Sequence, residues 1–97
     1  MKFVIVSTPP GDPPDWVREA WVGLILPEEN PDDPAIVRIG VLGGRPQNDG
    51  GYKVSGRTAI AALEEHNAAA AQWWFNNAAH VLLGSLTFSR DVCRVVE

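Results

Sequence analysis

The 97-residue chain has a single cysteine, Cys93. One thiol excludes an internal disulfide and any metal site built from several cysteines. No apolar run approaches the roughly 18 residues that a membrane-spanning helix needs, so no membrane partner is expected. The apolar run at residues 3–6 is also too short for the core of a signal peptide. The sequence therefore predicts a cytoplasmic protein.

Basic residues are few, with 8 Lys and Arg against 12 Asp and Glu and a formal net charge of −4. The excess acid is concentrated early: seven acids lie between Asp12 and Asp33, where Arg18 is the only basic residue. No Lys/Arg stripe accompanies them. Because neutralisation of phosphates supplies most of the affinity for nucleic acid, the sequence predicts no nucleic-acid partner.

Complete catalytic and cofactor motifs are also lacking. A thiolate–imidazole pair of Cys93 with His66 or His80 is one hypothesis, but the apolar neighbours of Cys93 favour a small core residue. The early acids Glu28, Glu29, Asp32 and Asp33 do not follow the alternating pattern of a calcium loop, which favours a solvated loop. We therefore expect no cofactor and no metal, and the sequence favours a non-enzymatic protein without excluding an enzyme.

What the chain does have is a change of pattern at Ser55. Before it, apolar runs alternate with turns rich in Pro, Gly and Asp, which is typical of strands. After it, Ser55 is a plausible helix N-cap, and Asn67 can end that helix and cap a second one. Strands are predicted at residues 3–6, 21–26, 35–42, 52–54, 82–89 and 92–96, with helices at 55–66 and at 68 to about 77.

These elements predict one α+β domain. The first two connections offer no room for a helix, so the first three strands are expected to pair antiparallel. The predicted fold is a small twisted antiparallel sheet, or a partial barrel of SH3-like size, with two short helices inserted before the last strands. The first two strands are apolar on both faces, and two short helices can cover only part of a sheet. The remaining apolar area must close into a barrel core or form a patch that meets another chain.

Glycines lead into the first predicted helix with the spacing of a phosphate-binding loop, but Arg57 stands where that motif has lysine. The planar guanidinium is not equivalent to the compact ammonium that the motif needs. A helix N-terminus beside an arginine still attracts anions. One hypothesis is therefore a small-ligand or anion-binding domain, enzymatic or not, that uses the loop 43–58. Its candidate anion-binding residues are Ser55, Gly56, Arg57 and Thr58. The simpler interpretation is a glycine-rich loop leading to a capped helix.

Tryptophan is the remaining functional lead, with four in the chain. Trp73 and Trp74 are adjacent on a predicted helix, about 100° apart, so one ring should lie nearer the surface. The favoured hypothesis is a small non-enzymatic interaction module that binds a protein partner or itself. Its predicted partner-binding residues are Trp16, Tyr52, Trp73 and Trp74. The alternative is that all four tryptophans, with Trp21 as the fourth, complete the core.

Overall fold

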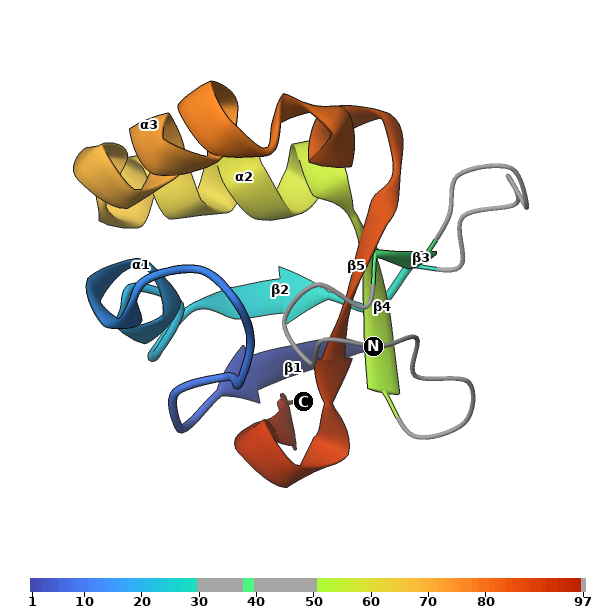
Figure 1. The fold of residues 1–97 in the computed structure, drawn as a ribbon. Coiled ribbons are helices and arrows are strands. Elements are labelled where there is room, and N and C mark those ends of the chain that lie inside the picture. Colours follow the sequence, from blue (N-terminus) through green and yellow to red (C-terminus); the bar gives the residue numbers. More distant parts are fainter. Residues whose placement is uncertain (30–37, 40–50, 97) are drawn as a thin grey trace.

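The computed structural model describes residues 1–29, 38–39 and 51–96, which form two small sheets with helices packed beside them (Figure 1). The strands are β1 (Lys2–Ile5), β2 (Ile25–Pro27), β3 (Arg38–Ile39), β4 (Gly51–Ser55), β5 (Ser85–Ser89) and β6 (Cys93–Val96). The helices are α1 (Asp15–Glu19), α2 (Gly56–His66) and α3 (Ala68–Asn77), with the 3-10 helices η2 (Ala79–Leu83) and η3 (Arg90–Val92). The predicted α+β class is confirmed.

The strands are divided between two three-stranded sheets. In sheet A, β1 lies between β2 and β6 and pairs antiparallel with both. In sheet B, β5 lies between β4, which is antiparallel to it, and β3, which is parallel. Helices α2 and α3 are inserted between β4 and β5, as predicted. Among the described strands the sheets stay open, so the domain is not a closed barrel.

The third predicted strand has a different partner from the one expected. Antiparallel pairing with the first two strands was predicted, but β3 belongs to sheet B and runs parallel to β5, with Arg38 opposite Ser85. The rest of the predicted strand 35–42 lies outside the described residues. Alternation of apolar residues identifies a strand but does not specify its neighbour, and here that neighbour comes much later in the chain.

A helix that the sequence did not predict, α1, occupies the first connection. Pro14 precedes it in an extended conformation, which is the usual backbone at an N-cap. Asp15 lies in the first turn, where a negative charge is favourable, and Val17 turns into the core. The expectation that this connection was too short for a helix is therefore wrong, because five residues after the prolines suffice for one short helix.

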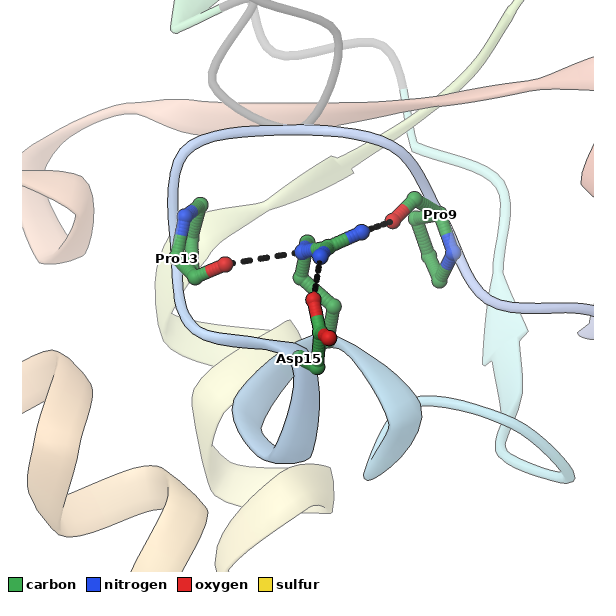
Figure 2. Close-up of polar contacts among 4 residues, drawn as sticks. Pro9, Pro13 and Asp15 are labelled. Atoms are coloured by element: carbon green, nitrogen blue, oxygen red, sulfur yellow. Dashed lines mark hydrogen bonds and ion pairs between the residues drawn. The ribbon is translucent and has the colours of Figure 1, made fainter.

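One side chain of α1, Arg18, holds the proline-rich segment in place. Its guanidinium donates hydrogen bonds to the carbonyl oxygens of Pro13, at 2.7 Å, and Pro9, at 3.1 Å, and forms an ion pair with Asp15 (Figure 2). Arginine suits this position because its five donors form a fixed planar fork. These contacts tie the proline-rich segment to α1.

The predicted strand at 21–26 is mostly a turn. The chain leaves α1 through backbone hydrogen bonds from Trp21 N–H to the Arg18 carbonyl and from Leu24 N–H to the Trp21 carbonyl. Gly23 has a φ of 94°, a conformation that glycine adopts without strain. Only Ile25–Pro27 forms a strand. The apolar character of this segment reflects burial of Trp21 and Leu24 in the core, and not a strand buried on both faces.

The core is a connected set of aromatic rings between the two sheets and the helices. Phe3 of β1 stacks on Tyr52 of β4 at 4.9 Å, and lies 5.9 Å from Phe88 of β5. Phe88 meets Trp21 edge-on at 5.1 Å, and Trp21 meets Trp74 of α3 at 6.0 Å. The rings come from two sheets, from α3 and from the turn after α1, so sheets and helices share one core.

Both helix caps occur where the sequence predicted them. The Ser55 hydroxyl accepts a hydrogen bond from Thr58 N–H at 3.2 Å, at the start of α2. The Asn67 side chain accepts one from Ala70 N–H at 3.1 Å, which ends α2 and starts α3. Figure 1 shows the resulting pair, with α2 and α3 lying against each other.

The predicted strand 82–89 begins later than expected, because Ala79–Leu83 forms the 3-10 helix η2. The backbone at the end of η2 approaches the start of α2: Gly56 N–H donates to the carbonyl of Gly84, the residue that follows η2, at 2.8 Å. A hydrogen bond between two main-chain groups cannot be predicted from the pattern of side chains in the sequence. The predicted strands 52–54 and 92–96 are confirmed as β4 and β6.

Candidate functional site

The tryptophans divide between core and surface. Trp21 and Trp74 are fully buried, whereas Trp16 of α1 is 49% exposed. Trp73 is partly buried and packs edge-on against Trp74, with 5.5 Å between ring centroids. The adjacent pair on α3 therefore splits into one buried ring and one partly exposed ring, as helix geometry predicted. The hypothesis that all four complete the core does not hold for Trp16.

Tyr52 and Trp74 do not reach the surface. Tyr52 is 5% exposed; its ring stacks on Phe3, and the Arg90 guanidinium lies over it, 4.6 Å from the ring centroid. Residues in these positions stabilise the core and cannot line an exposed patch. Of the four predicted partner-binding residues, Trp16 and Trp73 remain as surface candidates.

Phe75 is a surface aromatic that the sequence analysis missed. It is 36% exposed on α3, two residues after Trp73. Figure 1 shows α1 beneath α3, and the two helices are in contact. We use the name aromatic surface for the solvent-exposed parts of three rings from two contacting helices, Trp16, Trp73 and Phe75. Around α3, Trp73 and Phe75 lie on either side of the buried Trp74, about 200° apart.

The surroundings of the aromatic surface are unusual in charge. From Asn67 to Ser89 the sequence has no Asp, Glu, Lys or Arg, although several residues of α3 in this stretch are exposed. Exposed surfaces of small domains are normally about a quarter to a third charged. Depletion of charge around aromatic residues is instead typical of the centre of a protein interface. This charge-free stretch is the sequence signal that points to Phe75.

Acidic residues are exposed on α1 and α2, the two helices that contact α3. Glu19 is exposed and lies three residues after Trp16 on α1, which places the two on neighbouring positions of one helix face. Glu64 and Glu65 are exposed near the end of α2, where the chain turns into α3. The helical side of the domain thus combines exposed aromatic rings with negative charge.

The start of α2 does not form the phosphate-binding loop that its spacing suggested. Gly51–Ser55 is strand β4, paired along its length with β5, so no loop is present there to wrap a phosphate. The part of the predicted loop at 43–50 lies outside the described residues. Gly56 N–H is bonded to the Gly84 carbonyl, and Thr58 N–H to the Ser55 hydroxyl. Two of the donors that an anion would use are therefore occupied, and Arg57 is left exposed beside them.

The chain's own carboxylate takes the position of the expected anion. Glu29 Oε1 accepts a hydrogen bond from Ser55 N–H at 2.7 Å, and Oε2 lies 3.5 Å from the Thr58 hydroxyl. A carboxylate here is favoured by the positive end of the helix dipole. The interpretation of Glu29 as part of a solvated loop is wrong, because its side chain is partly buried and bonded to α2.

This arrangement predicts how the protein responds to anions. Glu29→Ala is expected to lower the free energy of unfolding by about 1 to 2 kcal/mol, through loss of a charge-assisted hydrogen bond at a helix N-terminus. At fixed ionic strength, sulfate should then stabilise Glu29→Ala more than the wild type, because the variant has lost the internal anion. Thermal unfolding measures both effects.

Glu28→Ala, the exposed neighbour with the same charge change, is the control. Equal stabilisation of the wild type would instead support an open anion site.

The cysteine, the histidines and the described acidic residues are the other candidates for catalysis or metal binding. Burial raises the pKa of the Cys93 thiol from 9.0 to about 12, so it stays protonated at neutral pH and is not an activated nucleophile. Cys93 is buried while His66 and His80 are exposed, which agrees with its predicted role in the core. Within the described ranges no cluster of His, Cys, Asp and Glu is arranged to hold a metal ion. Asp32 and Asp33 lie outside those ranges.

A pocket of about 410 Å³ opens beside the Glu29 contact, lined by Glu28, Glu29, Gly51 and Lys53. Its charged groups are of both signs, and the Glu29 backbone N–H is already bonded to the Lys53 carbonyl at 2.6 Å. None of the three residues of the aromatic surface lines this pocket.

Comparisons with known proteins returned no match among family models, curated proteins or solved structures. In the part of the chain that the structure describes, no helix has both the length and the apolar character to cross a membrane.

Proposed function

We propose that the protein is a small cytoplasmic, non-enzymatic interaction module that binds a protein partner, or a second copy of itself, through the aromatic surface. The observation that carries this proposal is the exposure of Trp16 and Phe75 beside a helix, α3, that has no charged residue. Tryptophan is among the residues most enriched at binding hot spots. The partly buried Trp73 adds a ring held in place by Trp74, so part of this surface is rigid before binding.

Loss of the two exposed rings is expected to weaken binding. In the variant Trp16→Ser/Phe75→Ser, partner or self-association should weaken by roughly 2 kcal/mol or more, about 30-fold, the usual size of a hot-spot effect. Sedimentation over a range of protein concentrations measures self-association. Retention of proteins from a host extract on the immobilised chain, with the bound protein then purified and titrated, measures binding to another partner.

Leu83→Ser is the matched control, because Leu83 is 66% exposed but lies on η2, outside the aromatic surface. It should bind as the wild type does. The proposal is contradicted if the double variant binds normally, or if Leu83→Ser loses as much affinity, since the latter would indicate unspecific adhesion of apolar side chains.

A further inference from the structure

The pocket of about 410 Å³ beside the Glu29 contact is separate from the aromatic surface. Two of its lining residues, Glu28 and Glu29, follow β2, and the other two, Gly51 and Lys53, belong to β4. Its volume is within the range of roughly 300 to 1,000 Å³ that is typical of small-molecule sites. The pocket is therefore large enough to hold a small ligand.

Backbone hydrogen bonds hold the walls of this pocket. Glu28 N–H donates to the Met1 carbonyl at 2.7 Å, and Glu29 N–H donates to the Lys53 carbonyl at 2.6 Å. The Glu29 carboxylate is bonded in turn to Ser55 N–H at the start of α2. The segment after β2 is thus fixed to both sheets before any ligand binds, which lowers the entropic cost of binding.

Lys53 and Glu28 bring opposite charges to the pocket without neutralising each other. Among the described residues no ion pair joins Lys53 to Glu28 or to Glu29. Glu29 is bonded to the start of α2, so Glu28 is the carboxylate that remains for a ligand. Lys53 is half-buried, and a charge partly removed from water gains more from an oppositely charged group than a fully exposed one does.

A buried hydroxyl without a partner lies on the same face of sheet B. Thr87 of β5 is directly opposite Lys53 of β4, and cross-strand neighbours project to the same side of a sheet. The Thr87 side chain occupies the space that a Cβ atom at Gly51 would need. Thr87 is 3% exposed, and its Oγ1 has no hydrogen-bond partner among the described residues. Because buried hydroxyls are normally paired, this face of the sheet has a polar group that a ligand could satisfy.

We propose that this pocket binds a small zwitterion of the amino-acid class, with the ligand's ammonium group at Glu28 and its carboxylate at Lys53, beside Thr87. A simple anion would be repelled by the two glutamates and a simple amine by Lys53, whereas a zwitterion satisfies both charges. The inference is independent of the aromatic surface and of any protein partner. It also places the predicted small-ligand site at Lys53 and Gly51 instead of at Arg57.

Calorimetric titration with the standard amino acids, at neutral pH and fixed ionic strength, tests the class of ligand. At least one of them should bind to the wild type. Its methyl ester keeps only the ammonium charge, and its N-acetyl derivative keeps only the carboxylate. Each derivative should bind about 10-fold or more weakly than the parent amino acid, because it loses one of the two charge-assisted contacts.

Variants of the lining residues test the location. Lys53→Gln and Glu28→Gln should each weaken binding of that amino acid about 10-fold or more. The charge-swapped variant Glu28→Lys/Lys53→Glu should bind it better than Glu28→Lys or Lys53→Glu alone, because a zwitterion can also bind in the reverse orientation. Thr87→Val should weaken binding without lowering the free energy of unfolding, since the hydroxyl has no partner to lose. Glu65→Gln, at an exposed acid of α2 that does not line the pocket, is the control.

Three results would overturn the inference. The first is that no standard amino acid binds to the wild type. The second is that the methyl ester or the N-acetyl derivative binds as tightly as the parent, which would show that one of the two charges is not recognised. The third is that Glu65→Gln weakens binding as much as Lys53→Gln does, since the effect would then not come from the pocket.

Discussion

Replacing Trp74 with alanine is expected to lower the free energy of unfolding by about 3 to 5 kcal/mol, the usual loss for a buried tryptophan. Trp74 is fully buried and meets both Trp21 and Trp73 edge-on. Its removal leaves a cavity where α3 joins the core. Domains of this size have a free energy of unfolding of only about 5 to 15 kcal/mol, so the substitution should remove a large fraction of the total stability.

Trp73→Ala is the matched control for this prediction, since it removes the same side chain from the next position of the same helix. Trp73 is only partly buried, so the expected loss is about 1 to 2 kcal/mol. Denaturant unfolding followed by circular dichroism measures both variants. Similar losses at the two positions would mean that α3 is not oriented with Trp74 inward, and would remove the basis for the aromatic surface.

Trp74→Phe separates packing from hydrogen bonding. The indole N–H of Trp74 has no hydrogen-bond acceptor among the described residues. Phenylalanine keeps an aromatic ring at the site and removes this buried unpaired donor. The loss of stability should therefore be clearly smaller than for alanine.

Gly56→Ala is expected to lower the free energy of unfolding by about 3 kcal/mol or more, although only one methyl group is added. A Cβ atom at Gly56 would lie 1.7 Å from the carbonyl oxygen of Val81 and 2.6 Å from its carbon. Both atoms are backbone, so no rotamer change can relieve the overlap. The start of α2 must move away from η2, and the hydrogen bond from Gly56 N–H to Gly84 is lost with it.

Gly23→Ala controls for the general effect of replacing a glycine. Gly23 has a positive φ of 94° but has no atom within 4 Å of an added Cβ. Only backbone strain is introduced there, worth about 1 to 2 kcal/mol. Denaturant midpoints compare the two variants. If Gly56→Ala is no worse than Gly23→Ala, then α2 does not approach η2 as closely as the structure indicates.

Local chemistry was predictable wherever neighbouring residues decide it. Ser55 and Asn67 were identifiable as helix caps because a short polar side chain satisfies a backbone N–H only a few residues away. The split between Trp73 and Trp74 followed from the angle between adjacent residues of a helix. The α+β class followed from the change of pattern at Ser55. None of these inferences depends on which distant segment packs nearby.

Other features could be decided only by the tertiary structure. The pairing of β3 with β5, the backbone contact of Gly56 with η2, and the binding of Glu29 to the start of α2 all join segments that are distant in sequence. The phosphate-loop spacing of Gly51 and Gly56 was misleading for the same reason. Gly51 pairs with Ser89 of β5 and is part of a strand, and Gly56 lies so close to the Val81 backbone of η2 that no Cβ atom fits there.

By itself the sequence determined the class of fold and the two capped helices. Only the tertiary structure decided which aromatic rings are exposed. The physical reason is that helix caps and helix geometry depend only on residues a few positions away in the sequence. The exposure of a side chain depends instead on which distant segment packs against it. Tyr52 illustrates the difference, because Phe3 and Arg90, from the two ends of the chain, together enclose its ring.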